Sequence, residues 1–301
     1  MTVREMGEYR MSTNVLVALN NLMKLQNNEL IEIYRGTVRN RVNSVGDALE
    51  YYIKDLFCSS IDEHDFAKKD LEYSKYLSYL GGPKNPPDFI IRKSSAVEVK
   101  KIEGITFGKI ALNSSYPKDT LSSSSTLITK ACRECENEFG GWTRKDMIYA
   151  IGNVLDNKLR VLWLLDGGCY CADEEVYNKI KSIIKDGVGE INGVEFADSK
   201  ELGRVNKVDP LQITDLRIRG MWNISHPMNV FDYLVDDYNR ETNLQVYCLM
   251  LKNKYDKICD NDKNSLREYI KKGKLIKQDI KIKNPNNPAK FIDAILYKAS
   301  L

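Results

Sequence analysis

Three side chains in the first third of the sequence could together hydrolyse a phosphate ester. Asp88 follows a pair of prolines, and Glu98 and Lys100 lie in the segment AVEVKKI. Two carboxylates offer the hard oxygen ligands that Mg²⁺ prefers, and the backbone carbonyl of Val99 could complete the set. A neighbouring ammonium can hold the attacking water or a phosphate oxygen. These residue types therefore predict metal-assisted cleavage of a phosphodiester.

The three side chains meet only if the segments that carry them form a β-hairpin. The runs DFIIR and AVEVKKI are both strand-like, and the residues 93–95 between them are typical of a turn. A turn centred on its middle residue would set Asp88 opposite Lys100 and Ile90 opposite Glu98. Side chains alternate between the faces of a strand, so the three would then share one face. The alternative is an edge hairpin whose charges simply face water.

A helix before the hairpin could bring a further carboxylate to it. Residues 43–57, NSVGDALEYYIKDLF, contain Ser44, which could cap a helix, and continue with an apolar stripe at helical spacing. Glu50 falls at the edge of that stripe, so it is a candidate accessory residue, although an exposed surface glutamate fits the periodicity equally well. A similar amphipathic pattern over residues 15–34 predicts one or two scaffold helices.

The remaining segments predict a mixed sheet covered by helices. Residues 126–139 fit a helix that ends at a Gly-Gly pair, and residues 174–185 fit another. The apolar runs DMIYAIGNVL and LRVLWLLDG fit neighbouring strands, and ITDLRIRGMW fits one more strand. This order of elements indicates an α/β fold in which helices pack on a central mixed sheet.

The charge balance excludes a generally basic protein. The 45 Lys and Arg residues are nearly matched by 42 Asp and Glu, so any surface that binds nucleic acid must be local. No apolar run approaches the roughly 20 residues of a membrane span, and the N-terminus lacks the continuous apolar stretch of a signal peptide. No phosphate-binding glycine loop occurs, so ATP is not expected as a cofactor. We expect a protein of the cytoplasm.

The seven cysteines are an odd number and do not resemble a disulfide framework, which fits a reducing compartment. Two close pairs could still form a zinc site, namely Cys132 with Cys135 and Cys169 with Cys171. The other interpretation is structural. It puts the first pair on consecutive turns of a helix and the second on one face of a strand end.

The hairpin and several other segments resemble the NgoPII family of type II restriction endonucleases. PPDFIIRKSSAVEVKKIEG is similar to the catalytic hairpin of PD-(D/E)xK nucleases, and residues 43–222 contain further segments that resemble the family in the same order. These are NSVGDALEYYIKDLFC, IALNSSYPKDTL, LITKACRECE and ELGRVNKVDPLQITDLRIRGMW.

The resemblance implies a restriction-endonuclease-like core and a Mg²⁺-dependent homodimer. Such an enzyme would cut double-stranded DNA at a short palindrome, GGCC in the family, and its host would need a cognate DNA methyltransferase. By the motif, Asp88, Glu98 and Lys100 would be catalytic, with Glu50 as an accessory carboxylate. Two rival interpretations stay open. One is another PD-(D/E)xK nuclease with a role in repair or defence, and the other is a catalytically inactive DNA-binding protein of the same fold.

Candidate DNA contacts follow from the same architecture. Arg217 and Arg219 would project from one strand face, where an arginine can bond both O6 and N7 of a guanine, although a solvated strand face is equally compatible. Polar residues after the hairpin could clamp phosphates, unless they form a plain surface loop. They are Asn113, Ser114, Ser115, Tyr116 and Lys118, and Lys130 and Arg133 are similar candidates on what could also be a solvated helix face.

These assignments suggest three parts of the chain. Residues 1–42 would form an N-terminal helical segment, and residues 43–190 the catalytic core. Residues 191–301 would form a DNA-recognition and dimerisation region, packed with the core as one globular unit.

Overall fold

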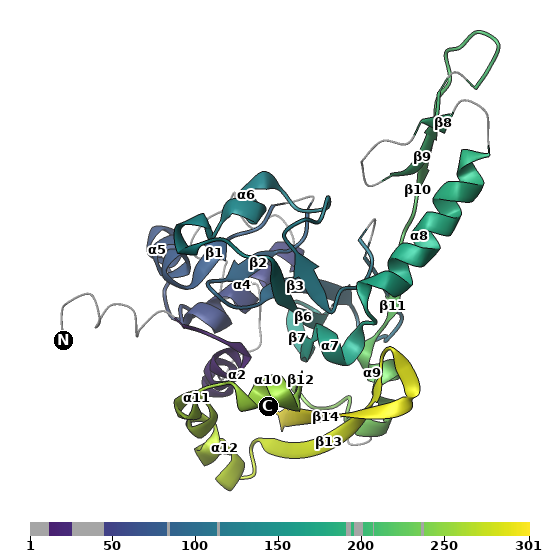
Figure 1. The fold of residues 1–301 in the computed structure, drawn as a ribbon. Coiled ribbons are helices and arrows are strands. Elements are labelled where there is room, and N and C mark those ends of the chain that lie inside the picture. Colours follow the sequence, from purple (N-terminus) through teal and green to yellow (C-terminus); the bar gives the residue numbers. More distant parts are fainter. Residues whose placement is uncertain are drawn as a thin grey trace.

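The computed structural model describes residues 12–25, 45–82, 85–112, 115–190, 194–195, 201–206, 208–235 and 238–301. A nine-stranded sheet flanked by helices forms its centre (Figure 1). The strands run in the order β1-β2-β3-β6-β7-β12-β14-β13, and β5 pairs with β6 outside this path. Their bounds are Leu77–Tyr79 (β1), Phe89–Ile91 (β2), Ala96–Glu103 (β3), Thr120–Ser122 (β5), Arg144–Leu155 (β6), Lys158–Asp166 (β7), Gln245–Leu251 (β12), Ile276–Asn284 (β13) and Asn287–Ser300 (β14).

The central sheet is mixed. Strands β3 and β6 are parallel, as are β7 and β12, whereas the other neighbouring strands are antiparallel. Together with the flanking helices, this arrangement confirms the predicted α/β class and is consistent with a restriction-endonuclease-like fold. No helix in the described parts of the chain is both long and apolar enough to cross a membrane.

Each face of the sheet buries its own apolar cluster. Helices α2 (Val15–Lys24) and α4 (Val45–Cys58) cover one face and bury side chains such as Leu19 and Leu49. On the other face Trp163 is fully buried, and its ring stacks on Tyr247 with centroids 4.6 Å apart. Alternation along β3 sends Val97 to the first cluster and Ala96 to the second. Glu98 and Lys100 lie two and four residues beyond Ala96, so they project to the second face.

Several predicted elements are confirmed. They include the β2–β3 hairpin, helix α4, the strand pair β6–β7, helix α8 (Glu174–Gly189) and strand β10 (Leu216–Arg219). Strands β6 and β7 are joined by Asp156 and Asn157, whose φ angles of 51° and 61° suit a tight hairpin turn. The predicted N-terminal helix is confirmed at α2, but residues 26–44 lie outside the described residues.

The helix predicted over residues 126–139 is wrong in extent. Only a five-residue helix, α6 (Lys130–Glu134), and a 3-10 turn, η1 (Asn137–Phe139), form there. Thr129 caps α6 because its hydroxyl accepts the N–H of Cys132 at 3.1 Å, so the helix cannot extend further back. Leu127 and Ile128 are instead buried against the body, where the Leu127 carbonyl accepts a bond from Asn85.

The last sixty residues contain structure that the sequence patterns left unassigned. Strands β12, β13 and β14 extend the central sheet, and three short helices connect β12 to β13. These helices are α10 (Lys252–Asp256), α11 (Asp260–Ser265) and α12 (Arg267–Lys271). The run IKQDIKIK alternates apolar and polar residues, so a strand there could have been predicted. Helix α5 (Phe66–Tyr76), after α4, was likewise not predicted.

Helix α8 and a small sheet form an arm that reaches away from the body (Figure 1). This sheet has the order β10-β9-β8, with β8 at Val194–Glu195 and β9 at Glu201–Val205. The arm returns to the body through β11 (Asn223–Ser225), which pairs with β4 (Lys109–Ala111). The remaining short elements are α7 (Gly167–Tyr170), α9 (Pro227–Val230) and η2 (Asp232–Leu234).

A buried polar cluster ties α4 to α5. The Asp55 side chain is fully buried. Its carboxylate accepts hydrogen bonds from Lys69, from Ser60 at 2.5 Å and from Tyr73 at 2.7 Å. Lys69 is also buried, so each charge compensates the other in a medium of low dielectric constant. The cluster fixes the position of α4, which carries Glu50.

We predict that Asp55→Ala lowers the free energy of unfolding by about 3 to 5 kcal/mol, because it leaves the Lys69 ammonium buried without its carboxylate. Glu72→Ala is the control, since Glu72 pairs with the half-exposed Lys75 and should matter by less than about 1 kcal/mol. Urea denaturation measures both. Equal effects of the two substitutions would contradict this account of the cluster.

Candidate active site

The β2–β3 hairpin brings Asp88 and Glu98 together. The backbone N–H of Asp88 donates to the carbonyl of Val97 at 3.0 Å, and its Oδ2 accepts the N–H of Val99 at 2.6 Å. Asp88 thus contacts the backbone on both sides of Glu98. The Asp88 carboxylate therefore bonds β3 beyond Phe89 and Val97, the last paired residues of the hairpin. This bond fixes the direction of the Asp88 side chain.

The predicted register of this hairpin is wrong by two residues. Ile90 pairs with Ala96, not with Glu98, because the turn closes between Ile91 and Ser95, with Lys93 at a positive φ of 55°. A shift of two residues keeps every side chain on its predicted face. The prediction that Asp88, Glu98 and Lys100 share a face therefore survives the error in register.

Glu98 and Lys100 form an ion pair on that face. The Lys100 Nζ donates to Glu98 Oε1 at 2.6 Å, and the two side chains are 21% and 14% exposed. The second carboxylate oxygen, Glu98 Oε2, is buried and has no hydrogen-bond partner among the described residues. A buried carboxylate oxygen without a donor is costly, so this atom is suited to a cation.

The surroundings of Asp88 and Glu98 disfavour negative charge on both carboxylates at once. Burial raises the pKa of Asp88 to about 8, and the charges of Glu98 and Glu50 act in the same direction. Lys100 and the Val99 N–H oppose this rise but do not cancel it. Burial lowers the pKa of Lys100, but the charges of Glu98 and Asp88 outweigh that effect and leave its pKa raised. The Lys100 ammonium therefore does not offset the combined effect of burial and the Glu98 charge on the pKa of Asp88.

Glu50 lies at the edge of this cluster. Its Oε1 accepts a bond from Lys54 at 2.6 Å, and the same ammonium donates to the Leu80 carbonyl at 3.2 Å. The Glu50 charge raises the pKa of both Asp88 and Lys100, so it acts on the site through space. Its hydrogen bond, however, goes to its own helix.

The donor set limits which metal could bind. Within the described ranges, no three His, Cys, Asp or Glu side chains gather in a way that could hold a metal ion. The four cysteines weighed as zinc ligands are free, and burial raises the thiol pKa of all four. Cys169 lies in the one-turn helix α7 and not at a strand end as predicted. Two carboxylates with an unpaired oxygen fit a hard cation that keeps several waters, such as Mg²⁺.

Lys118 approaches the same face from another segment. Its backbone N–H donates to the Tyr149 hydroxyl at 2.8 Å, and Tyr149 is the partner of Glu98 in the β3–β6 ladder. The Lys118 ammonium is buried, where it contacts Ser115 and donates to the Tyr116 carbonyl at 3.0 Å. Burial lowers the pKa of Lys118 to about 8, against the opposing effect of the Glu98 charge. Sequence spacing gave no sign of the link through Tyr149.

The other predicted DNA contacts are scattered. Asn113 and Ser114 lie outside the described residues, and the Tyr116 hydroxyl donates to Glu174 at 2.5 Å. Arg133 bonds the carbonyls of the serine-rich turn at Ser123 and Ser125. Lys130 is 82% exposed and lies 3.9 Å from Glu134. Arg217 and Arg219 are exposed on β10, in the arm.

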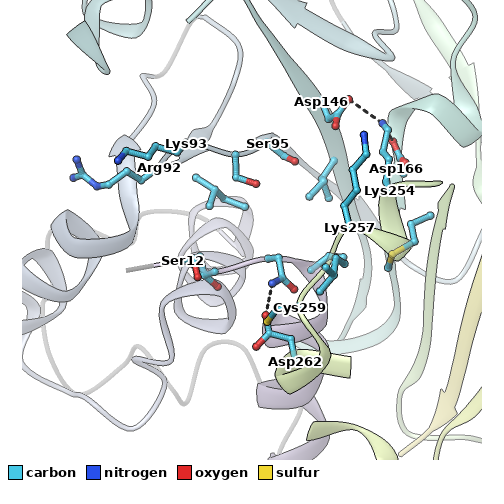
Figure 2. A pocket seen from close by; sticks show the side chains of 18 of the residues that line it. Ser12, Arg92, Lys93, Ser95, Asp146, Asp166, Lys254, Lys257, Cys259 and Asp262 are labelled. Atoms are coloured by element: carbon cyan, nitrogen blue, oxygen red, sulfur yellow. Dashed lines mark hydrogen bonds and ion pairs between the residues drawn. The ribbon is translucent and has the colours of Figure 1, made fainter. Parts of the chain in front are cut away.

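A separate hollow of about 470 Å³ contains none of these residues (Figure 2). It lies between α2, the β2–β3 turn and the segment around α10. Lys254 binds Asp146 at 3.0 Å and Asp166 at 2.7 Å, and Asn14 bonds Asp262 at 2.6 Å. The first two pairs join α10 to β6 and β7, and the third joins the segment before α2 to α11.

Comparison with known proteins identifies the family of the chain. The family model described as NgoPII restriction endonuclease matches residues 13–283, which include the hairpin, Lys118 and the arm. The chain is 44% identical over 278 residues to the type II restriction enzyme NgoPII of Neisseria gonorrhoeae, covering 91% of this chain and 96% of that protein. No solved structure matches the chain. The chain therefore belongs to the NgoPII restriction endonuclease family.

Proposed function

We propose that this chain is a Mg²⁺-dependent type II endonuclease that cuts both strands of a short DNA palindrome, with GGCC as its site. The observation that carries the proposal is the convergence of Asp88, Glu98 and Lys100 on one face of the hairpin. The second carboxylate oxygen of Glu98 is buried there without a donor. Membership of a restriction endonuclease family supports the reaction class.

The residues of the site have distinct roles in this proposal. Asp88 and Glu98 would hold the metal, together with the backbone carbonyl of Val99. When bound, Mg²⁺ supplies positive charge to the phosphate and lowers the pKa of a water ligand. Lys100, already oriented by its bond to Glu98, holds the attacking water or a phosphate oxygen. Glu50 contributes negative charge at the edge of the site as an accessory carboxylate.

The proposed DNA contacts are of two kinds: contacts to phosphates, which position the protein on the duplex, and contacts to bases, which recognise the sequence. Lys118, which is influenced by the charge of Glu98, and its contacts Ser115 and Tyr116 would bind the phosphate backbone, with Asn113 and Ser114 as their neighbours in sequence. Lys130 and Arg133 are further candidates for the backbone. The arm would bring Arg217 and Arg219 to the major groove, where each could read a guanine.

The biological setting follows from the reaction. Cutting both strands of a palindrome calls for two active sites related by a two-fold axis, so the working form is a homodimer. Its host would need a DNA methyltransferase of the same specificity in the cytoplasm, as a functional counterpart and not a bound partner.

Digestion of unmethylated plasmid DNA by the purified protein with Mg²⁺, followed by sequencing of the ends, tests the proposal. We expect discrete fragments that end at GGCC, and no cleavage when EDTA removes the metal. Fragments that end at another palindrome would overturn the assigned site. Random ends would contradict site-specific cleavage, and intact DNA would contradict the activity altogether.

Asp88→Ala and Lys100→Ala should each lower the cleavage rate by at least about 100-fold, since each removes a group worth several kcal/mol in the transition state. Specific DNA binding, measured by gel shift without Mg²⁺, should persist. Lys101→Ala is the matched control, because Lys101 lies on the opposite face of β3 and pairs with Glu103 at 2.7 Å. Normal cleavage by Asp88→Ala or Lys100→Ala would remove these residues from the site.

The metal-free protein should lose stability as pH rises. The pKa of Asp88 is raised from 3.8 to about 8 in the folded state, so the folded chain keeps a proton that the unfolded chain releases. The resulting stabilisation is complete below about pH 4 and is lost as pH rises to about 8. Asp88→Asn should flatten this part of the pH profile of the melting temperature in EDTA. Parallel profiles for the two proteins would contradict the raised pKa.

A further inference from the structure

Helix α8 turns its apolar side away from the molecule. Val176, Ile180, Ile183 and Ile184 form a stripe at helical spacing, and they are 51%, 47%, 57% and 39% exposed. The half-buried residues of the helix lie on another side and are mostly polar or charged: Glu174, Tyr177, Lys181, Lys185 and Val188. No residue of this sixteen-residue helix is fully buried. An amphipathic helix ordinarily packs its apolar stripe inward, so α8 is oriented for a partner that the described chain does not supply.

The inner side of α8 is held firmly at its base. The ring of Tyr177 stacks on Tyr116 with centroids 5.6 Å apart and meets the edge of Trp222 at 5.7 Å. The Tyr116 hydroxyl also donates to Glu174 in the first turn of α8. These contacts fix the rotation of the helix about its axis. The outward direction of the stripe is therefore set by packing.

We propose that the stripe of α8 binds the same stripe of a second copy of this chain, with the two helices antiparallel. Lys179 and Asp186 are two turns apart and border the stripe on the same edge, and both are exposed. Neither has an ion-pair partner within the described part of the chain. In an antiparallel pair centred between Ser182 and Ile183, each Lys179 would face Asp186 of the partner copy. The helix is thus complementary to itself, as a two-fold interface requires.

The chemistry of the surface favours protein over DNA as the occupant. Aliphatic side chains offer nothing to phosphates, whereas burial of apolar area is the main driving force of protein association. A stable interface buries roughly 800 Å² on each partner, more than four side chains provide. The rest of the arm and its connection carry further exposed apolar residues that could add area, namely Val208, Leu211, Ile213, Leu216 and Met221. Antiparallel helix dipoles also attract one another.

The proposal deepens the proposed function, because two-strand cutting needs two copies of the chain. Its first test measures mass by sedimentation without DNA or Mg²⁺, so it does not depend on catalysis. We expect the full chain to sediment at twice 34.5 kDa, and Ile180→Asp combined with Ile183→Asp to sediment at 34.5 kDa. Leu71→Asp is the control, since Leu71 is 60% exposed on α5 and should leave the dimer intact.

A charge exchange tests the antiparallel arrangement without touching apolar residues. Lys179→Asp or Asp186→Lys alone should raise the dimer dissociation constant about tenfold, because each places two pairs of like charges across the interface. The two substitutions in one chain restore opposite pairs and should return the constant to near the wild-type value. A double variant as weak as the single variants would overturn the antiparallel arrangement.

Crosslinking gives a second, independent readout. In a Cys259→Ser background, Ile183→Cys should form an intermolecular disulfide on oxidation, whereas Asn178→Cys on the opposite side of α8 should not. A folded Ile180→Asp/Ile183→Asp variant that stays dimeric and still cuts both strands would overturn the α8 interface but leave the proposed function intact. A wild-type protein that dimerises through α8 but cuts no DNA would overturn the proposed function and support the α8 interface.

Discussion

Two carboxylates buried side by side are the constraint on which the rest of the site depends. Asp88 and Glu98 repel one another in a medium that screens charge poorly, and burial with this repulsion raises the pKa of Asp88 to about 8. A protein that needed only stability would gain by replacing one of them with an apolar residue. Their presence together, with one oxygen of Glu98 unpaired among the described residues, is explained if a divalent cation completes the site.

The surrounding fold holds these charges in place from several directions. Asp88 bonds the backbone of β3 on both sides of Glu98, and Lys100 bonds Glu98 itself. The parallel pairing of β3 with β6 sets Tyr149 beside Glu98, and its hydroxyl accepts the backbone N–H of Lys118. Tyr116, two residues before Lys118, contacts the base of α8. One chain of contacts therefore links the hairpin to the arm and to the proposed dimer surface.

The sequence was sufficient where local chemistry decides the structure. Alternation and turn residues predicted the hairpin, and helical periodicity predicted α4 and α8. The common face of Asp88, Glu98 and Lys100 was also correct, since it depends only on parity along a strand. The register was wrong because a positive φ at Lys93 closes the turn earlier than symmetry suggests. The helix over 126–139 was too long because the local cap at Thr129 was not recognised and because the burial of Leu127 is a tertiary effect.

Other features could not follow from local patterns at all. The contact of Lys118 with Tyr149 joins a residue outside the strands to one in β6, and β12 finds its partners β7 and β14 far away in sequence. Nor does periodicity reveal which side of α8 faces outward, because an amphipathic pattern has the same appearance whether the stripe is covered by its own chain or by another.

Anomalous diffraction from Mn²⁺, a hard cation that shares the oxygen ligands of Mg²⁺, would test the central claim most directly. Crystals of the protein grown with Mn²⁺ should show a peak in coordinating contact with the carboxylates of both Asp88 and Glu98. A peak elsewhere, with none at the hairpin, would contradict the account of these carboxylates as the metal site.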